Sequence, residues 1–418
     1  MPKNPATPKG MKAARRRLPP LVVCALAALS ALVVVGHAQQ TPQDDQKQQR
    51  PRRVGGNNPV PAQTPRPPAG GEEVDEGDVV RVETQLVSVP AVVTDKTGRP
   101  LSHLRAENFV LYEDGRPQQI SNFATTEAPF EIALLLDTSG STRADIGLIR
   151  RAARTFLDGL RPGDRVALVA FNSSDGGPQG LATVEVLSGL TDDREQLQRA
   201  LENVGASNGT PYYDALERVA REVFRESPRA EVRGRRAVVA LTDGVDSASE
   251  ADFAEARRRL QATGVACYFV QVNTEDFVEE RLLRDCQEFG TLRLSQRQLE
   301  RYRRFFVPRA AAGAFGDFCQ MGPFERMDIS RKLYDLARRE MNDLARASGG
   351  KTFAAASLRD ARAAFAQVAA EIGTQYSLGY YSTNKTHDGR FRTIRVEIRG
   401  AGQGAQVRAR EGYYAPRS

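Results

Sequence analysis

The sequence predicts an α/β fold in which a doubly wound, mainly parallel sheet is inserted in a small antiparallel β-sandwich. Three observations predict it. The middle of the chain alternates short apolar runs with segments whose apolar residues recur at helical spacing. Those apolar runs are continuous, as in parallel strands that helices cover on both faces. Both ends of the folded region carry β-branched, alternating segments that are too few to form a core separately.

Residues 1–38 have the order of residues that is typical of a secretory signal. A basic stretch without acids is followed by the apolar run "LVVCALAALSALVVVG" and the small-residue end "GHA". We expect cleavage after Ala38 and export to the periplasm, the cell envelope or the outside of the cell. The alternative is an uncleaved anchor, although the run is shorter than the roughly 20 residues that a membrane span needs.

The net charge argues against a nucleic-acid partner. The chain carries a formal charge of +7, but six of these excess positive charges lie in residues 1–38. The remainder is almost neutral and has no concentrated basic patch beside a reading motif. We therefore expect no nucleic acid, and membrane contact only through the signal segment if it stays uncleaved.

Residues 39–77 are rich in Gln, Pro, Arg and Gly and almost lack large apolar side chains. Such a composition cannot bury enough surface to fold, so we expect a disordered linker. Residues 78–128 and 375–418 then form the two halves of the β-sandwich. Their strands are separated by strong turn signals such as "EDG" and "GAGQG".

Residues 129–374 form the inserted α/β domain. The predicted strands are 131–137, 164–172, 235–243, 264–272 and 351–356, and the predicted helices are 146–160, 193–204, 211–224, 250–263, 333–350 and 358–372. Residues 273–327 interrupt this order with two basic, amphipathic stretches. We interpret them as a helical insertion over one edge of the sheet, whose arginines form a solvated face or, alternatively, a binding face.

Three oxygen-rich turns occur where the predicted strands end or helices begin. They are "DTSGS" after the first strand, "GTPYYDAL" before a helix, and "LTDGVDS" after a later strand. Ligands of open parallel sheets bind beyond the carboxyl ends of the strands. Asp137, Ser139, Ser141, Thr210 and Asp243 are therefore candidate metal ligands. Such oxygen donors suit Mg²⁺, with Mn²⁺ or Ca²⁺ as alternatives.

Each turn also has a purely local interpretation. Ser141 or Thr142 is a suitable N-cap for the next helix, with Asp145 reaching back to it. Thr210 before Pro211 is a good cap as well. The "TDG" that contains Asp243 is an ordinary turn. Because the three turns occur together, we favour the metal site.

These turns resemble the metal-ion-dependent adhesion site of von Willebrand factor A (VWFA) domains. "DTSGS" matches the D-x-S-x-S pattern of that family, whose site also takes a threonine and an aspartate from two later loops; here these are Thr210 and Asp243. The signal, the linker, "DGRPQQISNF", "QYSLGYY" and "VRAREGYY" further resemble the VWFA-related domain family of exported, acidobacterial-type proteins. The resemblance implies Mg²⁺-dependent binding of a protein ligand that offers an Asp or Glu carboxylate to the metal.

We therefore expect an adhesion or scaffolding module that is not an enzyme. An alternative is a subunit of a cell-envelope complex that docks on an ATPase or channel partner. A hydrolase is disfavoured, because Ser139 stands where the aspartic-protease pattern has glycine and no second copy supplies a partner acid. No phosphate-binding glycine loop occurs, and the histidines do not support a catalytic triad.

Three cysteines follow the predicted signal. Cys286 and Cys319 flank one irregular region and are the candidate disulfide pair in an exported protein. Cys267 lies in the apolar run "GVACYFVQV" and is expected to be a buried thiol. The alternative, that all three are free, stays open.

Overall fold

The computed structural model describes residues 86–139, 145–173, 181–284, 293–311, 313–402 and 404–417. All of them belong to the second of two compact units, Val79–Ser418. The predicted signal, the predicted linker and the candidate ligand Ser141 lie outside the described residues. None of the helices in the described ranges combines the length and the apolar character of a membrane span.

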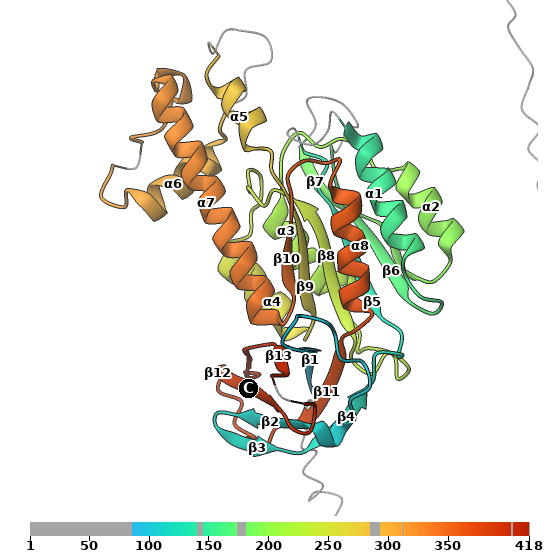
Figure 1. Ribbon diagram of the computed structural model, residues 1–418. Helices are drawn as coiled ribbons and strands as arrows, with labels where there is room; N and C mark the ends of the chain where they lie inside the picture. Colours follow the sequence, from blue (N-terminus) through green and yellow to red (C-terminus); the bar gives the residue numbers. More distant parts are fainter. Residues whose placement is uncertain are drawn as a thin grey trace, which may run out of the picture. The chain divides into compact units, whose positions relative to one another are not determined.

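A six-stranded sheet forms the centre of the inserted domain (Figure 1). Its strand order is β10-β9-β8-β5-β6-β7, and every neighbouring pair is parallel except β6 with β7. The strands are β5 (Glu131–Leu136), β6 (Arg165–Ser173), β7 (Ala182–Thr191), β8 (Arg236–Thr242), β9 (Ala266–Val272) and β10 (Lys351–Ala355). This confirms the predicted doubly wound, mainly parallel sheet.

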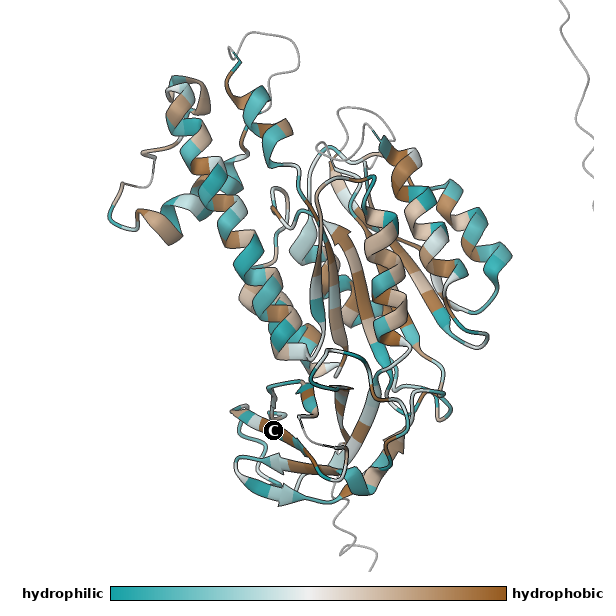
Figure 2. Ribbon diagram, viewed as in Figure 1, coloured by the Kyte–Doolittle hydropathy of each residue, from teal (hydrophilic) through white to brown (hydrophobic). Residues whose placement is uncertain are grey.

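Helices cover both faces of this sheet, which is why its central strands are largely apolar (Figure 2). Along β5, Ile132 and Leu134 pack in the cluster under α1 (Ile146–Asp158), α2 (Arg194–Glu202) and α8 (Ala361–Ile372). The alternate residues Ala133 and Leu135 pack under α3 (Tyr212–Arg218), α4 (Phe253–Ala262) and α7 (Pro323–Ser348). Alternate residues of one strand therefore belong to two different hydrophobic cores.

Two four-stranded antiparallel sheets form the β-sandwich, with orders β13-β1-β11-β4 and β14-β12-β2-β3. Their strands are β1 (Leu86–Thr94), β2 (Phe109–Glu113), β3 (Arg116–Gln118), β4 (Ile120–Ala124), β11 (Tyr376–Tyr381), β12 (Phe391–Ile398), β13 (Gln406–Ala409) and β14 (Gly412–Tyr414). N-terminal strands pair with C-terminal ones: β1 with β11 and β2 with β12. One apolar core lies between the sheets, as the sequence predicts.

Buried arginines join the sandwich to the inserted domain. Arg410 donates to the carbonyl oxygens of Ser88, Gln261 and Gly412 at 2.9–3.1 Å. Arg235 lies 4.0 Å over the ring of Phe130 and donates to two further carbonyls. A planar guanidinium with five donors can satisfy several buried carbonyls at once.

Strand β7 is absent from the sequence prediction. It lies at the edge of the sheet, pairs antiparallel with β6 and leaves much of its surface partly exposed. An edge strand keeps polar residues on its exposed side, so its apolar pattern is weak.

The insertion contains α5 (Glu275–Leu282), α6 (Gln296–Phe306) and the short 3₁₀-helix η5 (Phe318–Gln320). Its apolar residues pack around the N-terminal half of α7 and against Val245 in the loop after β8. The insertion contacts loops at the carboxyl ends of the strands, through Thr274 and Ser295 (Figure 1). Its predicted position over one edge of the sheet stays a prediction. Helix α7 also begins earlier than predicted, with Gly322 as N-cap and Pro323 in its first turn. The remaining short helical turns are η2 (Ala106–Asn108) and η4 (Val219–Val223), a π-helical continuation of α3.

Cys267 is a buried free thiol, as expected, and burial raises its pKa to about 12. Cys319 is disulfide-bonded. Because Cys286 lies outside the described residues, the pair Cys286–Cys319 stays a prediction.

Candidate metal centre

The three oxygen-rich turns are joined at the carboxyl edge of the sheet. Strands β5 and β8 are parallel neighbours in register at Leu136 and Leu241, and the amide of Asp137 donates to the Leu241 carbonyl at 2.9 Å. The first turn is joined to the segment just before the second turn, because the amide of Ser207 donates to the Thr138 carbonyl at 2.9 Å. Neighbouring strand ends therefore bring Asp137 and the third turn together.

The second turn is also bonded to the third. The amide of Thr210 donates to Oγ of Ser247 at 2.9 Å, and the amide of Ser247 donates to the Thr210 carbonyl at 3.0 Å. These reciprocal bonds fix the backbone of Thr210 beside the loop that carries Asp243. All three turns thus form one hydrogen-bonded layer.

The carboxylates of Asp137 and Asp243 are held in the same way. Each Oδ1 accepts a 3.0 Å bond from the amide two residues on, that of Ser139 or of Val245. Each Oδ2 accepts a 2.6 Å bond from a threonine hydroxyl. The Thr242 hydroxyl donates to Asp137, and the Thr274 hydroxyl donates to Asp243. Four uncharged donors therefore fix the two acids without neutralising them.

The two acids also affect each other electrostatically. Asp137 is fully buried and Asp243 is 4 % exposed. Burial raises the pKa of Asp137, and the nearby charge of Asp243 raises that pKa further, while the bonds from Ser139 and Thr242 oppose the shift. Two ionised carboxylates at such a site repel each other, and a bound cation relieves that repulsion.

The local interpretation of Thr210 does not match the start of helix α3. That of Ser141 or Thr142 stays a prediction, because both residues lie outside the described residues. The N-cap of α3 is Pro211, which makes no side-chain capping bond. Ser139 and Thr210 themselves are buried, at 2 % and 6 % exposure.

Helix α3 is capped from a distant loop, by Asp246 and Ser249. Oδ2 of Asp246 accepts from the amides of Tyr212 and Tyr213 at 2.9 and 3.3 Å, and the Ser249 hydroxyl bonds to the same oxygen. Burial raises the pKa of Asp246 to about 6. Asp246 is therefore a structural acid at the edge of the candidate centre.

The donor set fits a hard divalent ion. Within the described ranges no three His, Cys, Asp or Glu side chains gather as a metal cluster. What gathers instead is two carboxylates with buried hydroxyls, which are oxygen ligands of the kind that Mg²⁺, Mn²⁺ and Ca²⁺ prefer over thiolate or imidazole.

Three residues of this region escape the sequence argument. Thr242 could be found from its place directly before Asp243. Thr274 and Tyr334 could not, because they come from the insertion and from α7. No local pattern connects them with Asp243.

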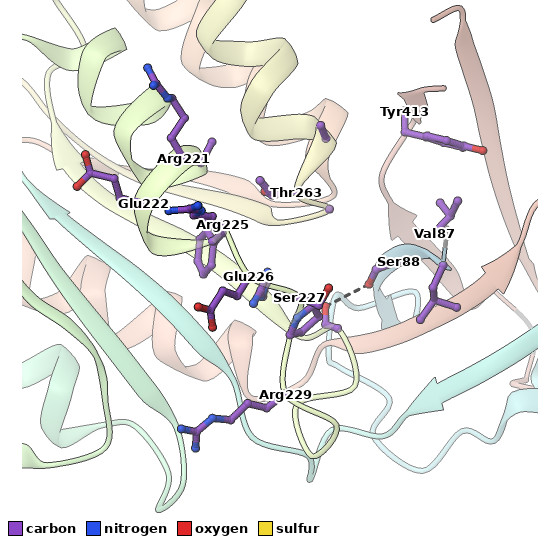
Figure 3. Close-up of a pocket in the computed structure, with 18 of the residues that line it drawn as sticks. Val87, Ser88, Arg221, Glu222, Arg225, Glu226, Ser227, Arg229, Thr263 and Tyr413 are labelled. Carbon is purple, nitrogen blue, oxygen red and sulfur yellow. Dashed lines mark hydrogen bonds between the residues drawn. The ribbon is translucent and has the colours of Figure 1, made fainter. Parts of the chain in front are cut away.

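A cavity with a volume of about 1450 Å³ lies elsewhere. Residues that line it come from the segment between η4 and β8 and from the sandwich, as Figure 3 shows for Arg225, Glu226, Ser227 and Ser88. Its lining mixes arginines and glutamates, which is typical of a solvated groove between two packed parts.

The comparisons with known proteins concern the same part of the chain. The model of the von Willebrand factor type A domain family matches residues 131–288. No curated protein matches the chain.

Several solved structures are similar to this chain over parts of its length, at low identity. A von Willebrand factor type A protein from Catenulispora acidiphila is 13 % identical, with 80 % of this chain and 75 % of that chain covered and a TM-score of 0.38. BatB from Bacteroides thetaiotaomicron, described as a conserved hypothetical protein, is 16 % identical over 58 % of this chain and 98 % of its own, with a TM-score of 0.35. Proximal thread matrix protein 1 from the mussel byssus, with a zinc-occupied MIDAS motif, is 16 % identical. The match covers 62 % of this chain and 49 % of that chain, with a TM-score of 0.36.

The chain thus spans about half the length of the mussel protein, in each of three structures of it. The family match covers strands β5 to β9 of the six-stranded sheet, whereas β10 lies beyond it. Residues 131–288 belong to the von Willebrand factor type A domain family.

Proposed function

We propose that this protein is an exported A-domain protein that binds a protein partner through a divalent metal ion. The ligands would be Asp137, Ser139, Ser141, Thr210 and Asp243, and Mg²⁺ is the ion we expect. The observation that carries the proposal is the pair of buried acids, Asp137 and Asp243, held close enough to raise the pKa of Asp137 and anchored by uncharged donors.

The chain's own residues hold and orient the oxygens of the site. Asp137 and Asp243 supply two negative charges, and the bonds from Thr242 and Thr274 prevent these carboxylates from turning away. A bound Mg²⁺ would balance these charges and offer a coordination position to an Asp or Glu of the partner. The site then binds without chemistry of its own, so we propose no enzymatic activity.

The proposed location follows from the N-terminal sequence. A cleaved signal (1–38) and a disordered linker (39–77) would carry the sandwich (78–128 with 375–418) and the A domain (129–374) outside the cytoplasmic membrane. A linker of this composition would let the folded unit reach partners in the envelope or beyond it.

A pull-down from native envelope extract tests the proposal. The purified protein is used as bait with Mg²⁺ or with EDTA, beside Asp137→Ala and the control Asp158→Ala, which changes an exposed acid of α1. We expect capture of a partner by the wild type and the control in Mg²⁺ alone, and none by Asp137→Ala. Equal capture by Asp137→Ala, folded as judged by its thermal unfolding, contradicts the metal-dependent mechanism.

A further inference from the structure

The insertion reaches the candidate centre through one buried hydroxyl. Thr274 Oγ1 donates to Oδ2 of Asp243 at 2.6 Å and lies 2.7 Å from the hydroxyl oxygen of Tyr334 on α7. All three side chains are buried, at 4–6 % exposure. The three groups form a chain of hydrogen bonds that solvent does not interrupt.

The donors and acceptors that each group offers fix the direction of these hydrogen bonds. An ionised carboxylate only accepts hydrogen bonds, so the single proton of the Thr274 hydroxyl goes to Asp243. The bond between Thr274 and Tyr334 must then use the proton of the tyrosine. Tyr334 donates to Thr274, and Thr274 donates to Asp243.

Thr274 does not act as its position in the sequence suggests. It is the N-cap of α5, where a threonine side chain usually accepts a hydrogen bond from a backbone amide of the first turn. Here the side chain makes no capping bond and is directed to Asp243 instead. The fold thus forgoes a local stabilisation to keep this hydroxyl at the acid.

A second contact fixes the insertion to the same loop. The Ser295 hydroxyl, at the start of α6, donates to the Ser247 carbonyl at 2.7 Å. Ser247 is the residue that holds the backbone of Thr210. The insertion therefore touches the candidate centre at both Asp243 and the Thr210–Ser247 junction.

We propose that Thr274 and Tyr334 are positioning residues for Asp243, so that metal affinity at the A-domain site depends on the insertion. This inference rests on the proposed metal site. Partners that orient a ligand commonly change metal affinity by about 10- to 100-fold when they are lost. The hydroxyl of Thr274, rather than its methyl packing, is the group that matters.

Mn²⁺ titration of the purified protein, followed by electron paramagnetic resonance, tests this with three variants. Thr274→Val keeps the shape and removes the hydroxyl, whereas Thr274→Ser keeps the hydroxyl. Tyr334→Phe removes only the outer donor. We expect about tenfold weaker Mn²⁺ binding for Thr274→Val, a smaller loss for Tyr334→Phe, and affinity within about twofold of the wild type for Thr274→Ser. Thermal unfolding in EDTA reports whether each variant is folded.

The outcomes separate this inference from the proposed function. Absence of Mn²⁺ binding by the wild type rejects the metal site and this inference with it. Binding by the wild type that is unchanged in folded Thr274→Val rejects the positioning role alone. Equal losses in Thr274→Ser and Thr274→Val also reject it, because packing would then account for the effect.

Discussion

The Thr242 hydroxyl donates a 2.6 Å hydrogen bond to Oδ2 of Asp137 and so links the carboxyl ends of β8 and β5. The same Oγ1 accepts a 2.9 Å bond from the amide of Gly244. Thr242 therefore shapes the turn that carries Asp243 while it orients Asp137. The Thr242 hydroxyl thus links, through hydrogen bonds, the two loops that supply the buried acids.

Thr242→Val should weaken metal binding by about tenfold, because Asp137 loses the donor that fixes its orientation. It should also lower the free energy of unfolding by about 1 kcal/mol through the lost hydrogen bond. Thr352→Val is the matched control, since the buried Thr352 hydroxyl has no hydrogen-bond partner among the residues described. Calorimetric Mn²⁺ titration and thermal unfolding in EDTA measure both effects. Identical affinities for the two variants would contradict the orienting role.

The ionisation of Asp246 should contribute to the pH dependence of the free energy of unfolding. Burial raises its pKa in the folded protein from 3.8 to about 6, so between pH 4 and 6 the folded state holds more protons at this group than the unfolded state. Its contribution is therefore fully present below pH 4 and is lost as the pH rises through about 6. As the pH rises from 4 to 6, we expect the free energy of unfolding to fall less in Asp246→Asn than in the wild type. Urea unfolding in EDTA at several pH values measures this fall. The same pH dependence in both proteins would contradict the prediction.

Gly350→Ala should destabilise the protein by about 3 kcal/mol. A Cβ at Gly350 would lie 1.9 Å from the carbonyl oxygen of Cys267, which is backbone and cannot rotate away. Gly189→Ala is the control, because a Cβ there meets nothing within 4 Å. We expect a change within about 0.5 kcal/mol for that variant in urea unfolding. Similar values for both would show that the backbone approach at Gly350 relaxes readily.

The sandwich and the inserted domain should depend on Arg410 for their packing. Arg410→Met removes donors from the carbonyls of Ser88, Gln261 and Gly412 in a buried place, and we expect a loss of about 3 kcal/mol. Arg390→Met is the control, because the Arg390 side chain is 83 % exposed and its ion pair spans 3.9 Å. It should change stability by less than about 1 kcal/mol in the same unfolding assay. If Arg410→Met is equally harmless, the arginine bonds do not hold the two parts together.

Sequence patterns predict the sheet and the candidate ligands because both follow local rules. Asp137 ends a continuous apolar strand, Asp243 ends another, and parallel strands bring their carboxyl ends to one edge. The pairing of the two chain ends is predictable because neither end has enough apolar strands alone.

The parts that the sequence hides depend on distant contacts or on weak patterns. Thr274 lies 31 residues from Asp243 and 60 from Tyr334, and its own context indicates only a helix cap. Strand β7 is hidden because an edge strand mixes exposed and buried residues without a clear period. The position of the insertion is set by its core with α7, which no short motif encodes.

Anomalous diffraction from crystals of the protein grown with Mn²⁺ tests the central claim most directly. The account predicts one Mn²⁺ peak within coordination distance of oxygens from Asp137, Ser139, Ser141, Thr210 and Asp243, and its absence from Asp137→Ala crystals grown in the same way. A wild-type map with no peak there, or with the only peak at other residues, would contradict it.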